Sequence, residues 1–140
     1  MPATTSALFR WDAAYSVNIS ILDTQHKNLV NMVNGLHQAM GEGTGKDQLG
    51  EILLNLVTYT QGHFTTEERL MQLHGYPDFP AHKAEHENLT NTVMEFKRRF
   101  LANEVGLTVE VMEFLRDWLI KHIQGSDKKY SPFLNAHGVR

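Results

Sequence analysis

The sequence predicts an all-α protein, an antiparallel up-down-up-down four-helix bundle with an irregular N-terminal arm and a short C-terminal helix. Apolar residues recur every three or four positions through four long segments, which is the period of an amphipathic helix. Breaks rich in Gly or Pro separate these segments at Gly41 to Gly45, Gly75 to Pro80 and Asn103 to Gly106. Connections of about four to six residues join antiparallel neighbours in helix bundles, so the helices should alternate in direction.

The predicted arm, residues 1–22, contains apolar side chains without a helical period and should lie over the bundle. The first helix is predicted at residues 23–40. Asp23 is expected to be its N-cap, because an Asp side chain can accept hydrogen bonds from the free N–H groups of a first turn. The inward stripe of this helix is expected to consist of Leu29, Val30, Val33, Leu36 and Met40.

The second helix is predicted at residues 46–74, because Gly75 is suited to the left-handed conformation that ends many helices. Its inward residues are expected to be Leu49, Leu53, Leu56, Leu70 and Met71. The third helix is predicted at residues 80–102, because proline is favoured in a first helical turn and Pro80 stands at that position. Its inward residues are expected to be Leu89, Val93 and Phe100.

The fourth helix is predicted at residues 107–124, and its inward residues are expected to be Val111, Leu115 and Trp118. The tail, residues 125–140, is expected to contain a short helix over residues 127–135. A chain of 140 residues buries roughly two thirds of the surface that its unfolded form exposes, which suits one hydrophobic core. Residues 1–140 are therefore predicted to form a single domain.

Charge and composition argue against several classes of function. The net charge is -3, and no run of like charge is longer than Lys97 to Arg99, so nothing indicates nucleic acid binding. The N-terminus resembles no signal peptide, and no run of about 18 apolar residues occurs, so we expect no membrane insertion and a cytoplasmic location. The chain has no Cys, which excludes disulfides, thiolate metal sites and cysteine-linked haem. A transition metal would need nitrogen and oxygen ligands.

Each predicted helix carries metal-binding residue types on its apolar stripe, where an unpaired imidazole or carboxylate is costly to bury. The candidate ligands are His26, His63, Glu67, His82, His86, His122 and Asp127. A spacing of four residues leaves two side chains about 40° apart around a helix and about 6 Å apart along it. His63 and Glu67 can therefore converge on one ion. The same spacing lets His82 and His86 converge.

All seven positions are expected at one end of the bundle. The candidate ligands of the first and third helices lie near helix starts, and those of the second and fourth lie near helix ends, so alternation brings them together. Asp127 follows His122 by five residues and would point about 140° away from it in a regular α-helix. The chain around Gly125 is therefore predicted to open into a wider turn.

Seven ligands are too many for one zinc or one octahedral ion, so two metal ions are implied. Two six-coordinate ions would have one position open if five histidines, two bridging carboxylates and one bridging solvent oxygen filled the others. Ligands rich in imidazole and free of thiolate suit iron. An open position on a ferrous ion, next to a second ferrous ion, suits O₂.

The candidate ligands belong to a larger pattern of sequence. Its stretches are Trp11 to Val17, Leu22 to Lys27, His63 to Glu68, Gly75 to Pro77 followed by His82 to His86, and Trp118 to Ile123 through Asp127. Over nearly the whole chain these stretches resemble the hemerythrin family, particularly its bacterial single-domain members. All seven ligand positions of the family pattern are present.

The resemblance implies a non-haem di-iron centre with two iron ions per chain, bridged by Glu67, Asp127 and an oxo or hydroxo group. It implies that the ligands of one iron are His82, His86 and His122. It implies that the ligands of the other iron, which takes up O₂, are His26 and His63. The residues that match the family's O₂ pocket are Phe64, Trp118, Leu119 and Ile123. Such an apolar lining would exclude water and slow irreversible oxidation.

The resemblance further implies reversible O₂ binding for oxygen storage, transport or delivery, in a protein that is not an enzyme. Three alternatives stay open. His82 to His86 fits the H-x-x-E-H pattern of one class of zinc peptidase, although the other candidate ligands then have no role. A di-iron oxidase on a ferritin-like bundle would use Glu-x-x-His motifs, which the sequence lacks. Oxygen or redox sensing would need a signalling partner protein, whereas delivery would suit an oxygen-consuming partner.

Taken singly, each motif also has a plainer structural interpretation, as a surface pair or a hydrogen-bonded core histidine. Among the other histidines, His37 is expected in the core or at its boundary. His74 and His137 are expected to contact solvent or backbone. Tyr130 is expected either to pack in the core or to donate a hydrogen bond near Asp127.

Overall fold

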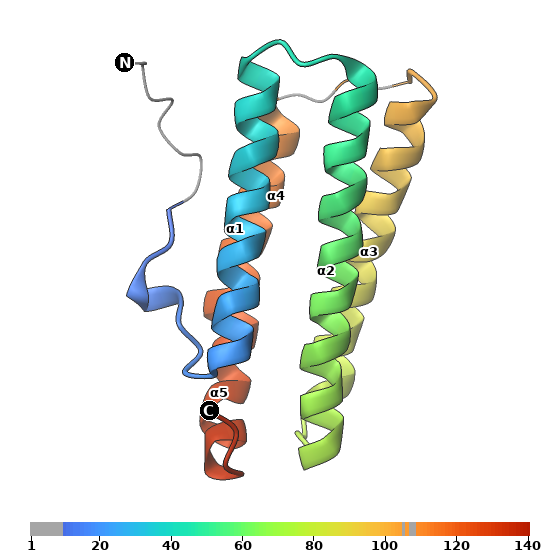
Figure 1. The fold of residues 1–140 in the computed structure, drawn as a ribbon. Coiled ribbons are helices and arrows are strands. Elements are labelled where there is room, and N and C mark those ends of the chain that lie inside the picture. The colour runs from blue at the N-terminus through green and yellow to red at the C-terminus, as the bar shows by residue number, and fades with distance from the viewer. Residues whose placement is uncertain (1–9, 105, 107–108) are drawn as a thin grey trace.

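The computed structural model describes residues 10–104, 106 and 109–140. In this part of the chain all regular structure is helical, and four long helices alternate in direction as an up-down-up-down bundle (Figure 1). These helices are α1 (Ser20–Gly41), α2 (Lys46–His74), α3 (Phe79–Leu101) and α4 (Val109–Lys121). The shorter elements are the 3₁₀ turn η1 (Ala13–Tyr15), the π-helical segment η2 (His122–Asp127) and the helix α5 (Lys128–Ala136). The predicted fold class is confirmed.

Helix α1 begins at Ser20, three residues before the predicted start, and the prediction that Asp23 caps it is wrong. The N-cap position belongs to Ile19, which has no side chain that could cap a helix. The Asp23 carboxylate instead accepts hydrogen bonds from the hydroxyl of Ser16 (2.6 Å) and the backbone N–H of Val17 (2.8 Å). Asp23 therefore fastens the N-terminal arm to the first turn of α1.

Helices α2 and α3 begin and end close to the Gly- and Pro-rich breaks of the sequence. Helix α2 covers the predicted residues 46–74 and ends at Gly75, whose φ of 70° places it in the left-handed region that favours glycine. Helix α3 begins at Phe79 with Pro80 in its first turn, as the sequence predicts, and ends one residue before the predicted end. The structure describes α4 from Val109, so the predicted start at residues 107 and 108 lies outside the described residues.

The predicted wider turn near Gly125 is confirmed. After Lys121 the chain passes into η2, where π-helical geometry replaces the α-helical hydrogen bonds with bonds to the residue five positions on. Because a π-helical turn is wider, two residues five positions apart come to lie on nearly the same face. Asp127 is thereby directed toward the same interior as His122, and both side chains are buried.

Helix α5 completes the end of the bundle at which α1 starts and α2 ends (Figure 1). Its Ser131 hydroxyl donates to the backbone oxygen of Val17, and its Asn135 amide donates to the backbone oxygen of Asn18 (3.1 Å). The arm is thus held by both α1 and α5, in agreement with the prediction that it lies over the bundle. Val17 is fully buried, so the arm contributes to the core.

The buried stripes agree with most of the predicted core in α1, α2 and α3, where Met40, Leu49, Leu70 and Val93 are only partly buried, while α4 differs more. In α4 the buried side chains include Met112 and Leu119, whereas the predicted inward residues Val111, Leu115 and Trp118 are only partly buried.

Within the described residues, no helix is long and apolar enough to cross a membrane.

Candidate metal centre

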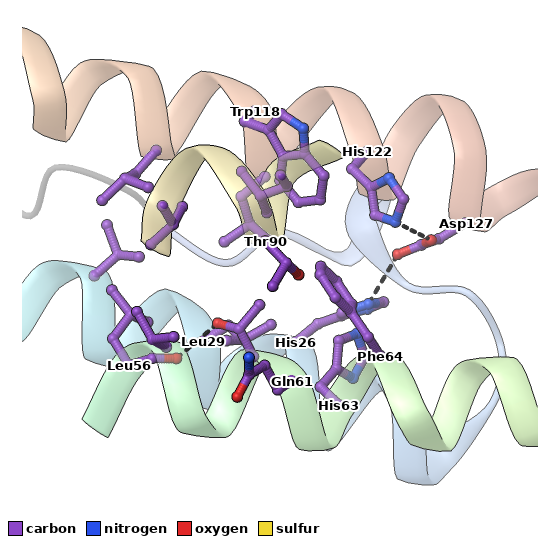
Figure 2. Close-up of a pocket in the computed structure, with 17 residues that line it drawn as sticks. His26, Leu29, Leu56, Gln61, His63, Phe64, Thr90, Trp118, His122 and Asp127 are labelled. Atoms are coloured by element: carbon purple, nitrogen blue, oxygen red, sulfur yellow. Dashed lines mark hydrogen bonds and ion pairs between the residues drawn. The ribbon is translucent and has the colours of Figure 1, made fainter. Parts of the chain in front are cut away.

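All seven candidate ligands lie together at the end of the bundle that carries α5, and all are buried. The contributing elements are α1 with His26, α2 with His63 and Glu67, α3 with His82 and His86, and η2 with His122 and Asp127. His82, the most exposed of them, exposes only 4% of its surface. Figure 2 shows dashed lines from Asp127 to both His122 and His26, so this carboxylate contacts one imidazole of its own segment and one of α1.

The ligand atoms fall into two groups, within each of which they lie no more than 4.8 Å apart. The first group consists of Glu67, His82, His86, His122 and Asp127. The second group consists of His26, His63, Glu67 and Asp127. The two carboxylates belong to both groups, whereas each histidine belongs to one. Below, these are called the three-histidine half and the two-histidine half of the site.

Each carboxylate offers one oxygen to each half. Asp127 Oδ2 lies 3.0 Å from His26 Nε2, while Asp127 Oδ1 lies 3.0 Å from the Nε2 atoms of both His82 and His122. Glu67 behaves likewise: Oε1 contacts His63 and lies 3.8 Å from His26, and Oε2 lies 3.5 Å from His82. This division of oxygens is the geometry needed for two carboxylates to bridge a pair of cations.

The atoms that face the interior lack the hydrogen bonds that buried polar atoms normally make. Both oxygens of Glu67 and of Asp127 have no hydrogen-bond partner among the described residues, and neither has Nε2 of His26 or His82. His86 Nε2 and His122 Nε2 face each other at 3.0 Å, a distance at which they can share at most one proton. Cations at the centre of these lone pairs would satisfy them, so the residues fit a pair of metal ions.

The buried carboxylates and imidazoles of the site shift one another's pKa values. Burial alone would lower the pKa of His26, but the facing carboxylates of Asp127 and Glu67 raise it to about 10. The pKa of His82 is raised to about 9 for the same reasons. Burial alone would raise the pKa values of both carboxyl groups, but the facing imidazoles hold them below their usual range. Burial lowers the pKa of His86 to about 3, so this imidazole is neutral.

Two further residues, which the sequence did not reveal, contact the outer nitrogens of the imidazoles, the Nδ1 atoms that face away from the site interior. Gln25 Oε1 lies 2.6 Å from His63 Nδ1, and Glu68 Oε2 lies 2.8 Å from His86 Nδ1. Both residues stand directly beside a candidate ligand in the sequence. That adjacency is a weak signal, because it does not tell which histidine of another helix the side chain reaches.

Tyr130 lies against the site from α5 and is fully buried. Its ring centroid is 5.5 Å from that of His82. Burial and the nearby charges of Asp127 and Glu67 raise its pKa well above the usual value, so the phenol is neutral. Tyr130 therefore closes the end of the site with an uncharged wall.

A cavity of about 50 Å³ adjoins the ligands on the side of the bundle interior (Figure 2). Of the predicted pocket residues, Phe64, Trp118 and Leu119 line it, whereas Ile123 is fully buried but does not. The apolar residues that line it and were not predicted are Leu29, Val33, Leu56, Val57, Leu89, Val93 and Leu115. They continue the inward stripes of the helices toward the middle of the bundle. The same helical periodicity that predicted the core could therefore have identified them as cavity-lining residues.

Two aromatic rings hold the imidazoles beside this cavity. The Phe64 ring stacks on His86 with centroids 3.7 Å apart, and the Trp118 ring stacks on His122 with centroids 4.5 Å apart. These contacts fix the planes of two rings in the three-histidine half while presenting only carbon-rich surface to the cavity.

Comparison with known proteins agrees with this geometry. Residues 17–134 match the family model described as the hemerythrin HHE cation binding domain. The chain is 40% identical over 131 residues to a bacteriohemerythrin of Methylococcus capsulatus, covering 93% of this chain and 99% of that protein. It is 37% identical to a bacteriohemerythrin of Stenotrophomonas maltophilia, covering 94% of this chain and 84% of that protein. A crystal structure described as wild-type hemerythrin superposes with a TM-score of 0.87 at 40% identity, covering 91% of this chain and 98% of that one.

Proposed function

The chain belongs to the hemerythrin family and is a non-haem iron oxygen-binding protein, and on that premise we propose that it binds O₂ reversibly at a di-iron centre. The proposed roles are oxygen storage, transport or delivery in the cytoplasm. The proposed cofactor is a pair of iron ions bridged by Glu67, Asp127 and an oxo or hydroxo group.

One observation carries the proposal: each buried carboxylate directs one oxygen to the two-histidine half and the other to the three-histidine half. A single ion would use the oxygens of both carboxylates on one side. Two groups of histidines sharing two carboxylates instead support two ions. We assign His82, His86 and His122 to one iron, and His26 and His63 to the other.

The two halves differ in the number of histidines, and this difference supports a binding position for O₂ in the two-histidine half. His26 and His63, the histidines of that half, both line the cavity, whereas His122 is the one histidine of the other half that does. Two ferrous ions held here would supply the binding position and two electrons for O₂, and would recover the electrons when O₂ leaves. The residues around them contribute geometry, exclusion of water and a fixed charge.

The apolar lining of the cavity is expected to protect the oxygen-bound site from water. Leu119 is 7% exposed and Phe64 is 5% exposed, so little bulk water can approach through them. Water and protons promote irreversible loss of electrons from such centres, and a hydrophobic shell restricts their access. Phe64, Trp118 and Leu119 are therefore the proposed pocket residues, and Ile123 is proposed to support them from the core.

The ligand chemistry supports a carrier over an oxidase. Di-iron oxidases on four-helix bundles use four Glu residues and two His, whereas this site offers five imidazoles and two carboxylates. Neutral imidazoles favour lower oxidation states than a carboxylate-rich set does. The zinc-peptidase alternative requires few ligands, and it leaves the shared geometry of Glu67 and Asp127 without a purpose.

Iron analysis combined with visible spectroscopy tests the proposal. The purified chain should contain two irons, and its spectrum should change when oxygen is removed and return when oxygen is readmitted. Zinc at one per chain without iron would establish the peptidase alternative. Consumption of O₂ coupled to oxidation of an added substrate would establish the oxidase, since a carrier returns its oxygen unchanged.

A further inference from the structure

The outer nitrogens of the imidazoles are held by two chemically different acceptors. His63, in the two-histidine half, has its Nδ1 2.6 Å from the amide oxygen of Gln25. His86, in the three-histidine half, has its Nδ1 2.8 Å from the carboxylate of Glu68. One acceptor is neutral and the other carries a negative charge, although both occupy the same position relative to their ring.

Both contacts fix the same tautomer. An amide oxygen or a carboxylate only accepts, so Nδ1 of each ring must carry the hydrogen, and Nε2 keeps its lone pair toward the interior. The Gln25 amide is held in this orientation because its Nε2 donates to the hydroxyl of Thr66 (3.4 Å). Glu68 is largely sheltered, with 23% of its side chain exposed, so water screens its charge only in part.

The remaining outer contacts extend the same asymmetry. Glu85, on α3, lies 3.9 Å from His122 Nδ1 and accepts a hydrogen bond from the Ser126 hydroxyl (2.8 Å), which brings a second carboxylate to the three-histidine half. Nδ1 of His26 and Nδ1 of His122 both lack a hydrogen-bond partner among the described residues, so the difference between the halves rests on Glu68 and on the nearby carboxylate of Glu85. The outer negative charge therefore gathers on one side of the site.

A carboxylate that accepts from the outer nitrogen of a metal-binding histidine increases the basicity of that ligand, and a neutral acceptor does so less. A more basic imidazole stabilises the more oxidised state of its metal. We propose that Glu68, acting through His86, and Gln25, acting through His63, are positioning residues that make the three-histidine half the stronger electron donor. This inference rests on the proposed di-iron function. It assigns the electronic difference between the two irons to outer acceptors as well as to ligand number.

Two isosteric substitutions in the full iron-loaded chain test the inference. Glu68→Gln removes the outer charge, and Gln25→Glu adds one to the other half. The measurements are the midpoint reduction potential of the iron pair in an anaerobic titration and the affinity for ferrous iron by competition with a chelator. Glu68→Gln should raise the potential, and Gln25→Glu should lower it. A tenfold change in the oxidised-to-reduced equilibrium corresponds to about 59 mV for one electron.

The matched controls carry the same changes of charge on exposed positions of α2 far from the site. These are Glu51→Gln and Gln48→Glu, and Glu51 lies about 26 Å along the helix from Glu68. Both controls should keep the wild-type potential. Iron affinity should fall about tenfold to hundredfold in Glu68→Gln, as is usual when an outer partner of a metal-binding histidine is lost.

Opposite shifts in the two variants support the inference, because a merely structural role would move both in the same direction. Shifts of the same sign, or potentials equal to those of the controls, would overturn it while leaving the di-iron function intact. If Glu68→Gln fails to retain iron, Gln25→Glu still decides the sign, because it keeps an acceptor at His63. Wild-type protein without two irons would overturn the proposed function and this inference together.

Discussion

His122 and Asp127 stand at the two ends of the π-helical segment η2, and His122 Nε2 lies 3.0 Å from Asp127 Oδ1. The wider turn is what lets two residues five positions apart reach one centre. π-Helical turns within α-helices are found frequently at functional sites. Here the widening has an identifiable purpose, because it delivers a carboxylate from the same chain segment as one of the imidazoles.

Replacing Asp127 by Asn should abolish the paired metal site. The substitution keeps the size of the side chain but removes the charge that faces His26, His82 and His122. The variant is expected to contain fewer than two irons per chain by metal analysis, with the helical circular dichroism spectrum unchanged. Asp117→Asn, on the exposed face of α4, is the matched control and should keep two irons. Two irons in Asp127→Asn would refute the bridging assignment.

Substituting either histidine of the two-histidine half should selectively weaken that half. His26→Ala or His63→Ala is expected to lose one iron preferentially and to lose O₂ uptake, because each removes one of only two imidazoles there. The loss of affinity should exceed the roughly tenfold to hundredfold cost of losing an outer contact. The measurements are iron per chain and oxygen uptake.

The matched control for this pair is His37→Ala. His37 lies on α1 as His26 does, about 16 Å along the helix, and is only partly buried. This variant should keep two irons and normal oxygen uptake. Wild-type behaviour of His26→Ala and His63→Ala would contradict the assignment of these two residues.

The features of the fold that depend on residues close together in sequence could be predicted. Gly75 and Pro80 act on the backbone within one helical turn, so they predicted the end of α2 and the start of α3 well. The convergence of the seven side chains followed from spacing and helix direction. Asp23 was misjudged because its carboxylate satisfies the N-terminal arm instead of its own helix, a competition that residue type does not show.

The outer contacts escaped prediction for a different reason. Gln25 reaches His63 across 38 positions of sequence, and Glu68 reaches His86 across 18. Such contacts depend on the rotation of each helix about its axis to within a fraction of a turn. A hydrophobic stripe fixes that rotation too loosely to pair individual polar side chains. The same looseness explains why Met112 and Leu119 are buried among the described side chains of α4, whereas the predicted Val111 and Leu115 are only partly buried.

Truncating the pocket wall should separate iron binding from its protection. Leu119→Ala is expected to keep two irons but to oxidise faster in air, because the enlarged cavity admits water. It should also lower the free energy of unfolding by about 2–5 kcal/mol, as is usual for a buried Leu→Ala change. The measurements are iron content, the rate of loss of the oxygenated spectrum, and chemical denaturation.

Leu73→Ala is the control for this variant, because Leu73 lies on α2 with 76% of its surface exposed. Exposed substitutions usually change stability by less than about 0.5 kcal/mol, and the oxidation rate should equal that of the wild type. An oxidation rate in Leu119→Ala equal to that of Leu73→Ala would remove Leu119 from the pocket.

Removal of the metal should give the protein a stability maximum at mildly acidic pH. The pKa values of His26 and His82 rise from about 6.5 in the unfolded chain to about 10 and about 9 in the fold. Their contribution to stability is therefore complete below about pH 6.5 and is lost as the pH rises through 9 and 10. The pKa values of Glu67 and Asp127 are held low, so the stability that these carboxylates contribute is lost as the pH falls. The pKa of His86 is also lowered, to about 3, so stability falls further as the pH drops from about 6.5 toward 3 and this histidine takes up a proton in the unfolded chain.

Thermal unfolding of the metal-free chain checks this expectation. Its Tm should fall by more than about 3 °C between pH 7 and pH 10, which corresponds to roughly 1 kcal/mol for a chain of this size. Iron-loaded protein should show a much smaller alkaline loss, because the metal then occupies the nitrogens that would otherwise carry protons, and protons compete less with metal as the pH rises. A metal-free Tm that stays constant or rises toward pH 10 would contradict the protonation of His26 and His82 in the empty site.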